Sequence, residues 1–304
     1  MIDILEVKKF EKLKLILHDF CKENRLSKEK TIERIQNYEN HFKREDTIYF
    51  LATVNDVSVG FMSCEIAEEI IRTHRLFVKK SEEYDSIIFE LITYVTKQLE
   101  SLKKNFLQIF IVNSLKLEQK LVENDFTVFQ RVKMVYDLKE NLIPEFVLDS
   151  DYQHDYFSLD RLDEELQIIV DANKNHIDGE IFLQFSNLDI LKKFFFSSNM
   201  DGDRRRDDSP IVLRNDKIVG VNIITNISEK ASYIWIIALL HEHRGKGLGK
   251  YLMLKAHENC KKANVDQMVL DVTVDNIAAY NLYKKLGYKE TNRYLTVIKE
   301  YSIK

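Results

Sequence analysis

The sequence predicts an α/β protein made of two tandem domains, each a mixed, twisted β-sheet flanked by helices. Two observations support this. The order β-β-β-α-β-α-β can be traced twice along the 304 residues, a comfortable length for two domains of ~150 residues. An Asn-Asp turn also joins the first two of these strands in each half, at Asn55-Asp56 and at Asn215-Asp216. We therefore expect an internal duplication.

The elements of the first half follow from residue periodicity. Alternating apolar and β-branched residues predict strands, and apolar residues three or four positions apart predict helices. We expect strands at 4–7, 48–54, 57–63, 70–78, 106–112 and 128–138. Helices are expected at 10–20, 28–42, 86–102 and 115–123, with Ser27 as the N-cap of the second.

The second half follows a linker at 139–151, where Pro144 and acidic residues interrupt the pattern. The predicted domains are therefore 1–142 and 150–304. In the second domain we expect strands at 210–214, 217–224, 233–240 and 268–274. A helix is expected from Tyr251, another after Asn276, and a last strand ending at Tyr301.

Three of the chain's eight glycines, Gly245, Gly247 and Gly249, lie within five residues between a predicted strand and a predicted helix. Glycine lets backbone N–H groups turn toward one point, and a helix start adds unpaired N–H groups and a positive dipole end. This layout favours an anionic ligand that carries phosphate. The spacing is neither the Walker phosphate loop nor G-x-G-x-x-G.

The spacing Arg244-x-x-Gly247-x-Gly249 resembles the pyrophosphate loop of the GCN5-related N-acetyltransferase (GNAT) superfamily. The segment from Asn276 to Tyr288 is similar to the family's N-x-x-A-x-x-L-Y-x-K-x-G-[FY] signature. The resemblance covers roughly 210–301. It implies two tandem GNAT domains, similar to the two-domain mycothiol synthase-like proteins, and acetyl-CoA as co-substrate.

The resemblance also assigns roles to residues. Backbone groups of the strand at 237–239 would bind the pantetheine arm, the loop at 244–250 the pyrophosphate, and Asn276 the amide arm. Tyr283 would be the general acid for the departing thiolate and would also contact the coenzyme. The expected coenzyme-binding residues are Ile237, Ala238, Leu239, Arg244, Gly245, Lys246, Gly247, Leu248, Gly249, Lys250, Asn276 and Tyr283.

An acceptor amine must lose a proton before it attacks, so a base is needed. Asp271 matches the family's carboxylate position on the strand after the loop, although a purely structural role stays open. Glu242 and His243 are alternatives. His241-Glu-His243 does not have the H-E-x-x-H spacing, so no metal is expected. Cys260 lies mid-helix and nothing in the sequence suggests an activated thiolate there, which argues against a covalent intermediate.

The two predicted domains are chemically unequal. In the first, the segment that corresponds to the glycine loop is Glu83–Phe89, with Glu83 at the arginine position and no glycine. Glu83 and Asp85 would repel phosphate groups. Gly60 is the one glycine of this domain. We expect a degenerate GNAT-like domain that does not bind coenzyme A and that shapes or covers the acceptor site of the second.

The predicted reaction is direct transfer of the acetyl group of acetyl-CoA to a primary amine of a small molecule. A protein or peptide acetyltransferase and a non-catalytic acyl-CoA-binding regulator stay open as alternatives. Arg204–Arg206 could meet an anionic group of the acceptor, although such a charge run is usually a solvated loop. Phe194–Phe196 is expected to pack in a core or between domains.

The overall composition bounds the partners and the compartment. The net charge of −4 gives no electrostatic basis for nucleic-acid binding. The start of the chain lacks a signal-peptide pattern, and no apolar run approaches the ~20 residues of a membrane span. The three cysteines are far apart, as expected for reduced thiols. We therefore expect a cytoplasmic protein, monomeric or homodimeric, that binds neither membrane nor nucleic acid.

Overall fold

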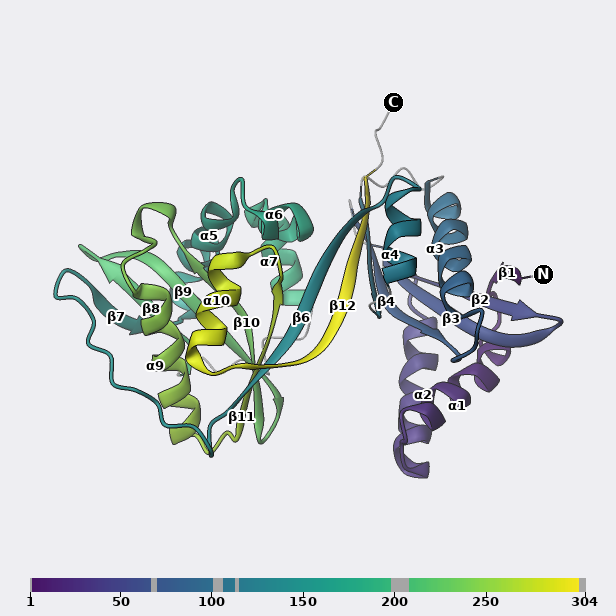
Figure 1. Ribbon diagram of the computed structural model, residues 1–304, viewed down its shortest axis with the longest axis horizontal. Helices are drawn as coiled ribbons and strands as arrows, with labels where there is room; N and C mark the ends of the chain where they lie inside the picture. The colour runs from purple at the N-terminus through teal and green to yellow at the C-terminus, as the bar shows by residue number, and fades with distance from the viewer. Residues whose placement is uncertain (1, 67–69, 101–105, 113–114, 198–207, 301–304) are drawn as a thin grey trace. The chain divides into compact units, whose positions relative to one another are not determined.

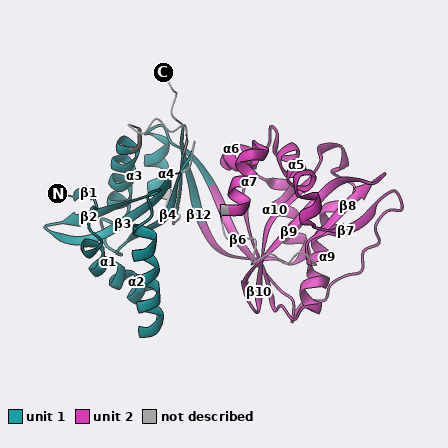
Figure 2. Ribbon diagram, turned by 180° about the vertical axis from the view of Figure 1, so that it is seen from behind, with its two compact units in different colours: residues 1–129, 294–304 teal, residues 130–293 magenta. Residues whose placement is uncertain are grey.

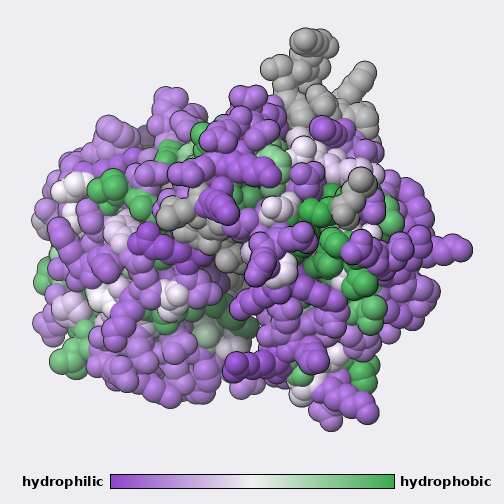
Figure 3. Space-filling view, turned by 45° about the vertical axis from the view of Figure 1, so that its right-hand side comes forward, coloured by the Kyte–Doolittle hydropathy of each residue, from purple (hydrophilic) through white to green (hydrophobic). Residues whose placement is uncertain are grey.

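The structure is a computed structural model that describes residues 2–66, 70–100, 106–112, 115–197 and 208–300 (Figure 1). The chain forms two compact units, shown in different colours in Figure 2. Unit 1 contains residues 1–129 and 294–304, and unit 2 contains residues 130–293. The face in Figure 3 is mostly hydrophilic, with apolar residues in small groups. Among the described residues, no helix is long and apolar enough to cross a membrane.

Unit 1 has a mixed sheet covered by helices on both faces. Its strands are ordered β1 (Ile2–Glu6), β2 (Thr47–Val54), β3 (Val57–Ile66), β4 (Ile70–Val78), β5 (Phe106–Val112) and β12 (Lys289–Glu300). Its helices are α1 (Lys14–Glu23), α2 (Lys28–Phe42), α3 (Tyr84–Glu100) and α4 (Leu115–Val122). Alternate strand residues point to opposite faces, so Phe50 and Ala52 pack with α3 while Tyr49 and Leu51 pack with α1.

Unit 2 repeats this arrangement. Its strands are ordered β6 (Thr127–Asp137), β11 (Gln267–Thr273), β10 (Ala231–Leu239), β9 (Lys217–Ser228), β8 (Pro210–Arg214) and β7 (Gln153–Tyr156). Its helices are α5 (Leu162–Asn173), α6 (Ile177–Ile181), α7 (Leu188–Ser197), α9 (Leu248–Lys262) and α10 (Ile277–Leu286). Helices α5 and α7 pack in one hydrophobic cluster with β8 to β10, and α9 and α10 pack in another with β6 and β11.

Two local features appear at matching places in both units. The predicted Asn-Asp turns are present, with φ of 49° and 62° at Asn55 and Asp56 and of 51° and 61° at Asn215 and Asp216. Each turn leads into a strand whose glycine lies opposite the end of the next strand, Gly60 opposite Val78 and Gly220 opposite Leu239. The structure therefore has the predicted α/β architecture twice.

The last strand of each sheet comes from the other half of the chain. β12 pairs antiparallel with β5 from Tyr294 to Glu300, and β6 pairs antiparallel with β11 from Arg131 to Asp137. The compact units therefore differ from the predicted domains 1–142 and 150–304. The reason is physical: β6 and β12 are both long strands with a buried apolar stretch, and such a pattern does not specify which sheet edge the strand joins.

The ends of some helices differ from expectation. The first helix begins with a 3-10 turn at Phe10–Leu13 before α1. Helix α9 begins at Leu248, three residues before the predicted start, so that Gly249 lies in its first turn. Ser27 caps α2 as predicted, with its hydroxyl accepting from the backbone N–H of Lys30 at 3.3 Å. Of the phenylalanines of α7, Phe195 is buried in the core and Phe194 stacks on Trp235 with centroids 6.1 Å apart.

Candidate active site

A cavity of about 310 Å³ opens in unit 2 between the end of β10, the glycine turn and helix α10. It brings together ten of the twelve residues expected to bind a coenzyme: Ile237, Ala238, Leu239, Arg244, Gly245, Gly247, Gly249, Lys250, Asn276 and Tyr283. The other lining residues are Ala172, Asn173, His176, Asp178, Ala278, Ala279 and Leu282. The sequence motifs therefore converge on one concave site.

The cavity lies where β10 and β11 separate. These parallel strands are paired only from Ala231 to Tyr233, while β10 continues to Leu239 along β9. In an antiparallel pair, alternate residues turn their N–H and C=O groups away from the partner strand. Beyond Tyr233, such groups of β10 face the gap rather than β11. Strand β10 has therefore separated from β11 at 237–239, where the pantetheine arm is expected to bind.

The glycine turn has the backbone geometry that glycine allows at little cost. Gly245 and Gly247 have φ of 74° and 80°, in the left-handed region. Gly247 is the N-cap of α9, and no side chain caps this helix. The first N–H groups of a helix have no intrahelical acceptor, and the helix dipole is positive there. The turn and helix start therefore form an anion-binding arrangement.

Gly249 allows close packing inside the site. A Cβ atom at this position would lie 3.3 Å from Leu282 Cδ2 on α10 and 3.6 Å from Leu239 Cδ1 on β10. At Gly247 a Cβ atom would lie 3.1 Å from the ring of Phe146. The two glycines thus let the helix start approach α10 and the 139–151 segment.

Arg244 holds the loop in place. Its Nε donates to the carbonyl oxygen of Leu239 at 3.1 Å, and its Nη2 donates to the carbonyl oxygen of Ala172 at 2.6 Å. The guanidinium is therefore committed to the ends of β10 and α5, although it also lines the cavity. Besides the pyrophosphate contact expected of the loop, Arg244 therefore has a positioning role.

The two remaining loop residues lie outside the cavity lining. Leu248 is buried in a cluster with Tyr152, Tyr251 and Leu252. Lys246 is exposed and lies with Leu248 beside the 146–150 segment. Their side chains therefore face away from the site, and a contribution from them would come from the backbone.

Tyr283 lies on α10 at the edge of the cavity and is only 5% exposed. Burial, and to a smaller extent the negative charge of Asp178, raises the pKa of its hydroxyl. The hydroxyl is therefore protonated at neutral pH and is available as a hydrogen-bond and proton donor.

Asp178 on α6 connects several parts of the site. Its Oδ1 accepts from the Thr273 hydroxyl and its Oδ2 from the Asn276 amide, each at 2.8 Å. The Asn276 Oδ1 in turn accepts from the backbone N–H of Ala279 at 3.3 Å, so Asn276 caps α10. The Asn276 side chain lines the cavity but is already bonded at both ends, which leaves less of it for the expected amide contact.

Arg131 on β6 also contacts the hydrogen-bonded group formed by Asp178 and Thr273. It is 6% exposed, and its guanidinium donates to the Thr273 hydroxyl at 3.1 Å and lies 3.8 Å from Asp178. Arg131 belongs to the predicted first domain, yet through β6 it is part of unit 2. The first half of the chain thus contributes directly to the second unit's site.

His176 lies beside Asp178 on the cavity wall. Its Nδ1 is 3.3 Å from the backbone N of Asp178 and 3.7 Å from the Asp178 carboxylate. Burial lowers the pKa of the ring, so it is neutral at pH 7. Neither residue is predicted from the sequence, because both precede the recognised motifs. The pair His176-Ile-Asp178, between two apolar helices, is the only signal that could have drawn attention to them.

Asp271 is not among the residues that line the cavity. It is half-buried on β11, where its Oδ2 accepts from the Tyr233 hydroxyl at 2.8 Å while its Oδ1 is buried without a hydrogen-bond partner. Its expected role as base is therefore not supported by direct access to the cavity.

The alternative bases near the loop lie elsewhere too. His243 is buried against Tyr152, whose hydroxyl is 3.0 Å from its Nδ1, and Glu242 is exposed; neither lines the cavity. Cys260 is buried in the core of unit 2. The predicted acceptor contact at Arg204–Arg206 lies outside the described residues.

Comparison with known proteins agrees with this geometry. Residues 180–288 match the model of the Acetyltransferase (GNAT) family. In sequence, N-alpha-acetyltransferase 30 of Schizosaccharomyces pombe is 31% identical over 91 residues, covering 28% of this chain and 61% of that protein. The mycothiol acetyltransferase of Corynebacterium efficiens is 28% identical over 91 residues, covering 30% of this chain and 31% of that protein.

In structure, a tandem GNAT protein from the clavulanic acid biosynthesis pathway matches 99% of this chain and 98% of its own, with a TM-score of 0.60 and 11% identity. That likeness concerns the fold. The chain spans 61% and 31% of the lengths of the two curated relatives. Residues 180–288 thus match the GNAT family model, and the chain as a whole has the fold of a tandem GNAT protein.

Proposed function

We propose that unit 2 is an N-acetyltransferase that moves an acetyl group from acetyl-CoA directly to a primary amine of a small molecule. The observation that supports this most is the single cavity that joins an uncapped helix start, an unpaired stretch of strand and a buried tyrosine hydroxyl. The helix start suits the pyrophosphate, and the gap beyond Tyr233 suits the pantetheine arm.

In the proposed reaction the amine nitrogen attacks the thioester carbon, and the carbon–sulfur bond breaks. A backbone N–H of β10 near Ala238 polarises the thioester oxygen. The departing sulfur takes up the Tyr283 proton, and the proton that the attacking nitrogen loses on becoming an amide restores the Tyr283 hydroxyl, so no phenolate remains although a phenol (pKa ~10) is a weaker acid than a thiol (pKa ~8.5). The raised pKa of Tyr283 keeps that proton in place until the thiolate forms.

The acceptor arrives as an ammonium ion and must lose one proton first. His176 is better placed than Asp271 to take it, because His176 lines the cavity and is neutral. In the neutral ring Nδ1 accepts from the backbone N–H of Asp178, so the proton is on Nε2 and Nδ1 is the basic nitrogen; the Asp178 carboxylate, 3.7 Å from Nδ1, stabilises the imidazolium that forms when Nδ1 takes up a proton. The Asp271 carboxylate instead accepts from the Tyr233 hydroxyl, and neither residue lines the cavity.

These roles can be separated by rate. His176→Ala should lower kcat by ~10²-fold or more, the effect of removing a general base. It should also remove the rise of the rate with pH on the acidic side of the pH–rate profile, which is called the acidic limb below. Because the base must be unprotonated, the wild-type rate should rise with pH through a pKa below the usual histidine value of ~6.5. Asp271→Asn should keep that limb. A limb that disappears in Asp271→Asn instead would return the role of base to Asp271.

Two other functions stay in view. The similarity to an N-alpha-acetyltransferase supports a protein or peptide amine as the acceptor. A non-catalytic acyl-CoA-binding regulator would use the same cavity without turnover, and Tyr283→Phe would then leave its function intact.

The test is release of coenzyme A thiol from acetyl-CoA in the presence of small amines, of peptides with free N-termini, or of no acceptor. The proposal predicts amine-dependent release that is strongest with a small molecule. Release only with peptides would establish the protein acetyltransferase, and binding of acetyl-CoA without release would favour the regulator. No binding at all would contradict an acyl-CoA function.

A further inference from the structure

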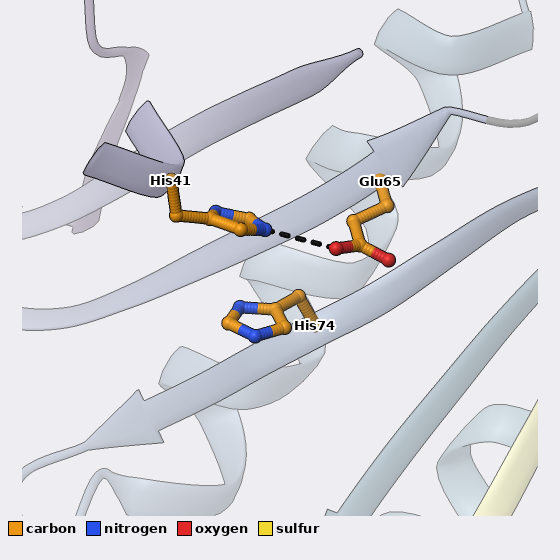
Figure 4. A group of neighbouring side chains, drawn as sticks. All are labelled: His41, Glu65 and His74. Carbon is orange, nitrogen blue, oxygen red and sulfur yellow. Dashed lines mark hydrogen bonds and ion pairs between the residues drawn. The ribbon is translucent and has the colours of Figure 1, made fainter. Parts of the chain in front are cut away.

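We propose that His41, Glu65 and His74 of unit 1 form a binding site for a divalent transition-metal ion such as Zn²⁺. Figure 4 shows the three side chains gathered beside one another. One ligand atom from each, an imidazole nitrogen or a carboxylate oxygen, lies within 4.8 Å of the other two. Imidazole and carboxylate are ligand types that Zn²⁺ accepts.

The three residues come from three elements that the fold of unit 1 holds together. His41 is in the last turn of α2, Glu65 is near the end of β3, and His74 is in the middle of β4. β3 and β4 are paired, with Cys64 opposite Thr73 and Glu65 opposite Arg72. The cluster is therefore a product of tertiary structure, which is why no metal-ligand spacing appears in the sequence.

His41 has the surroundings of a metal-ligating histidine, because one of its ring nitrogens is hydrogen-bonded to a buried hydroxyl and the other points at a second proposed ligand. Its Nδ1 lies 2.7 Å from the hydroxyl of Tyr49, a side chain only 1% exposed. This bond fixes the ring and directs Nε2 at Glu65 Oε1, 3.0 Å away. A ligating histidine usually uses its second nitrogen in this way, which sets its tautomer and orientation.

His74 supplies the third ligand from the solvent side. Its ring stacks on that of His41, with centroids 4.1 Å apart and planes 20° from parallel, and its Nδ1 is 3.5 Å from the Ser63 hydroxyl. Because stacked rings direct their lone pairs in parallel, the His74 ring must turn to share an ion with His41. His74 is exposed, and turning would break its stacking on His41. Water would complete a four-coordinate site.

Two arginines are charged neighbours of the cluster: Arg75, whose guanidinium lies over the Phe20 ring, and Arg44. Arg44 lies 3.5 Å from Glu65 Oε1, but its guanidinium also makes a two-pronged contact with Asp46 at 2.9 and 2.6 Å. A bound ion would compete with Arg44 only for Glu65. It would tie the end of α2 to the β3–β4 pair and so stabilise unit 1, because binding to the folded state alone adds to stability.

The test is calorimetric titration of ZnCl₂ into the chelator-treated full chain, with circular dichroism to confirm folding. We expect one ion per chain in the wild type. His74→Ala changes an exposed residue and should weaken binding by more than the ~100-fold that loss of an outer contact can cost. His18→Ala, which removes an exposed histidine of the same unit, should leave binding unchanged.

A second variant addresses the outer contact. Tyr49→Phe keeps the ring but removes the hydroxyl beside His41 and should weaken Zn²⁺ binding by ~10–100-fold. Absence of one-to-one binding in the wild type, or binding equally tight in His74→Ala, would overturn the proposal. The cluster would then be an ordinary hydrogen-bonded group that holds α2 against the sheet.

Discussion

The two units have the same fold and differ most where a strand gives way to a helix. In unit 2, β10 leads through glycines with φ of 74° and 80° into α9, whose start no side chain caps. In unit 1, β4 leads through Lys79–Glu83 into α3, which begins at Tyr84 with Asp85 in its first turn. We expect the carboxylate there to complement the helix dipole and to repel a second anion.

This contrast shows that the sheet and the ligand site are separate properties of the fold. Both units keep the short parallel pairing that splays a strand, Ala231–Tyr233 in unit 2 and Ile70–Arg72 in unit 1. Only unit 2 adds the glycines beside its splayed strand. A phosphate-bearing ligand should therefore distinguish the two units, while changes to the shared sheet should affect both.

The largest expected effect is that of Gly247→Glu. A φ of 80° strains any side chain, a Cβ would lie 3.1 Å from Phe146, and the new charge would repel a pyrophosphate. We expect acetyl-CoA affinity to fall by ~10³-fold or more, since three effects of ~1–2 kcal/mol each act together. Isothermal titration calorimetry measures this. Ser86→Glu, at the matching place in unit 1, should leave the affinity unchanged.

The next effect concerns turnover within unit 2. Tyr283→Phe should lower kcat by ~10²–10⁴-fold, the usual contribution of a positioned proton donor, with acetyl-CoA binding kept. Tyr280→Phe is a matched control on the same helix, because the Tyr280 hydroxyl bonds to Glu290 and does not line the cavity. Equal kcat values for the two variants in steady-state kinetics would contradict the role of Tyr283 as proton donor.

A moderate effect on stability tests a feature that both units share, the close approach of the next strand to a glycine. At Gly60 a Cβ atom would lie 2.8 Å from Val78 Cγ2 and 2.9 Å from the Phe77 carbonyl oxygen; at Gly220 it would lie 2.3 Å from Leu239 Cδ2. Gly60→Ala and Gly220→Ala should each lower the free energy of unfolding by ~1–3 kcal/mol, as overpacking does. Urea denaturation measures the change. A neutral result at either position would show that the close approach is not shared.

The smallest effect is specific to unit 2 and depends on pH. His257 is fully buried, its Nε2 lies 2.8 Å from the Tyr288 hydroxyl, and burial lowers its pKa to about 3. The unfolded chain then takes up a proton near pH ~6.5 that the folded state does not, so stability falls as pH drops below that value, by at most ~1.4 kcal/mol per unit.

His257→Gln should remove this part of the slope. The difference between variant and wild type, followed by urea denaturation from pH 7 to 5, isolates His257 from the other titrating groups. Parallel slopes in the two proteins would show that the folded state accepts the proton.

The helices and strands, the Asn-Asp turns and the glycine loop could be predicted from the sequence, because each depends on a few adjacent residues. Pairing between distant residues was not accessible in this way. The partners of β6 and β12, and hence the place of Arg131 beneath Asp178, depend on which sheet edge a strand joins. Asp178 and His176 carry no motif of their own, and only folding brings them to Asn276 and the cavity.

The central claim is that one unit of two binds acyl-CoA, and the number of acetyl-CoA sites per chain tests it most directly. Isothermal titration calorimetry of the full chain should give one site, and Gly247→Glu should abolish it. Two sites would contradict the contrast between Glu83–Phe89 and the glycine turn. No site would leave the fold intact but remove the function proposed for it.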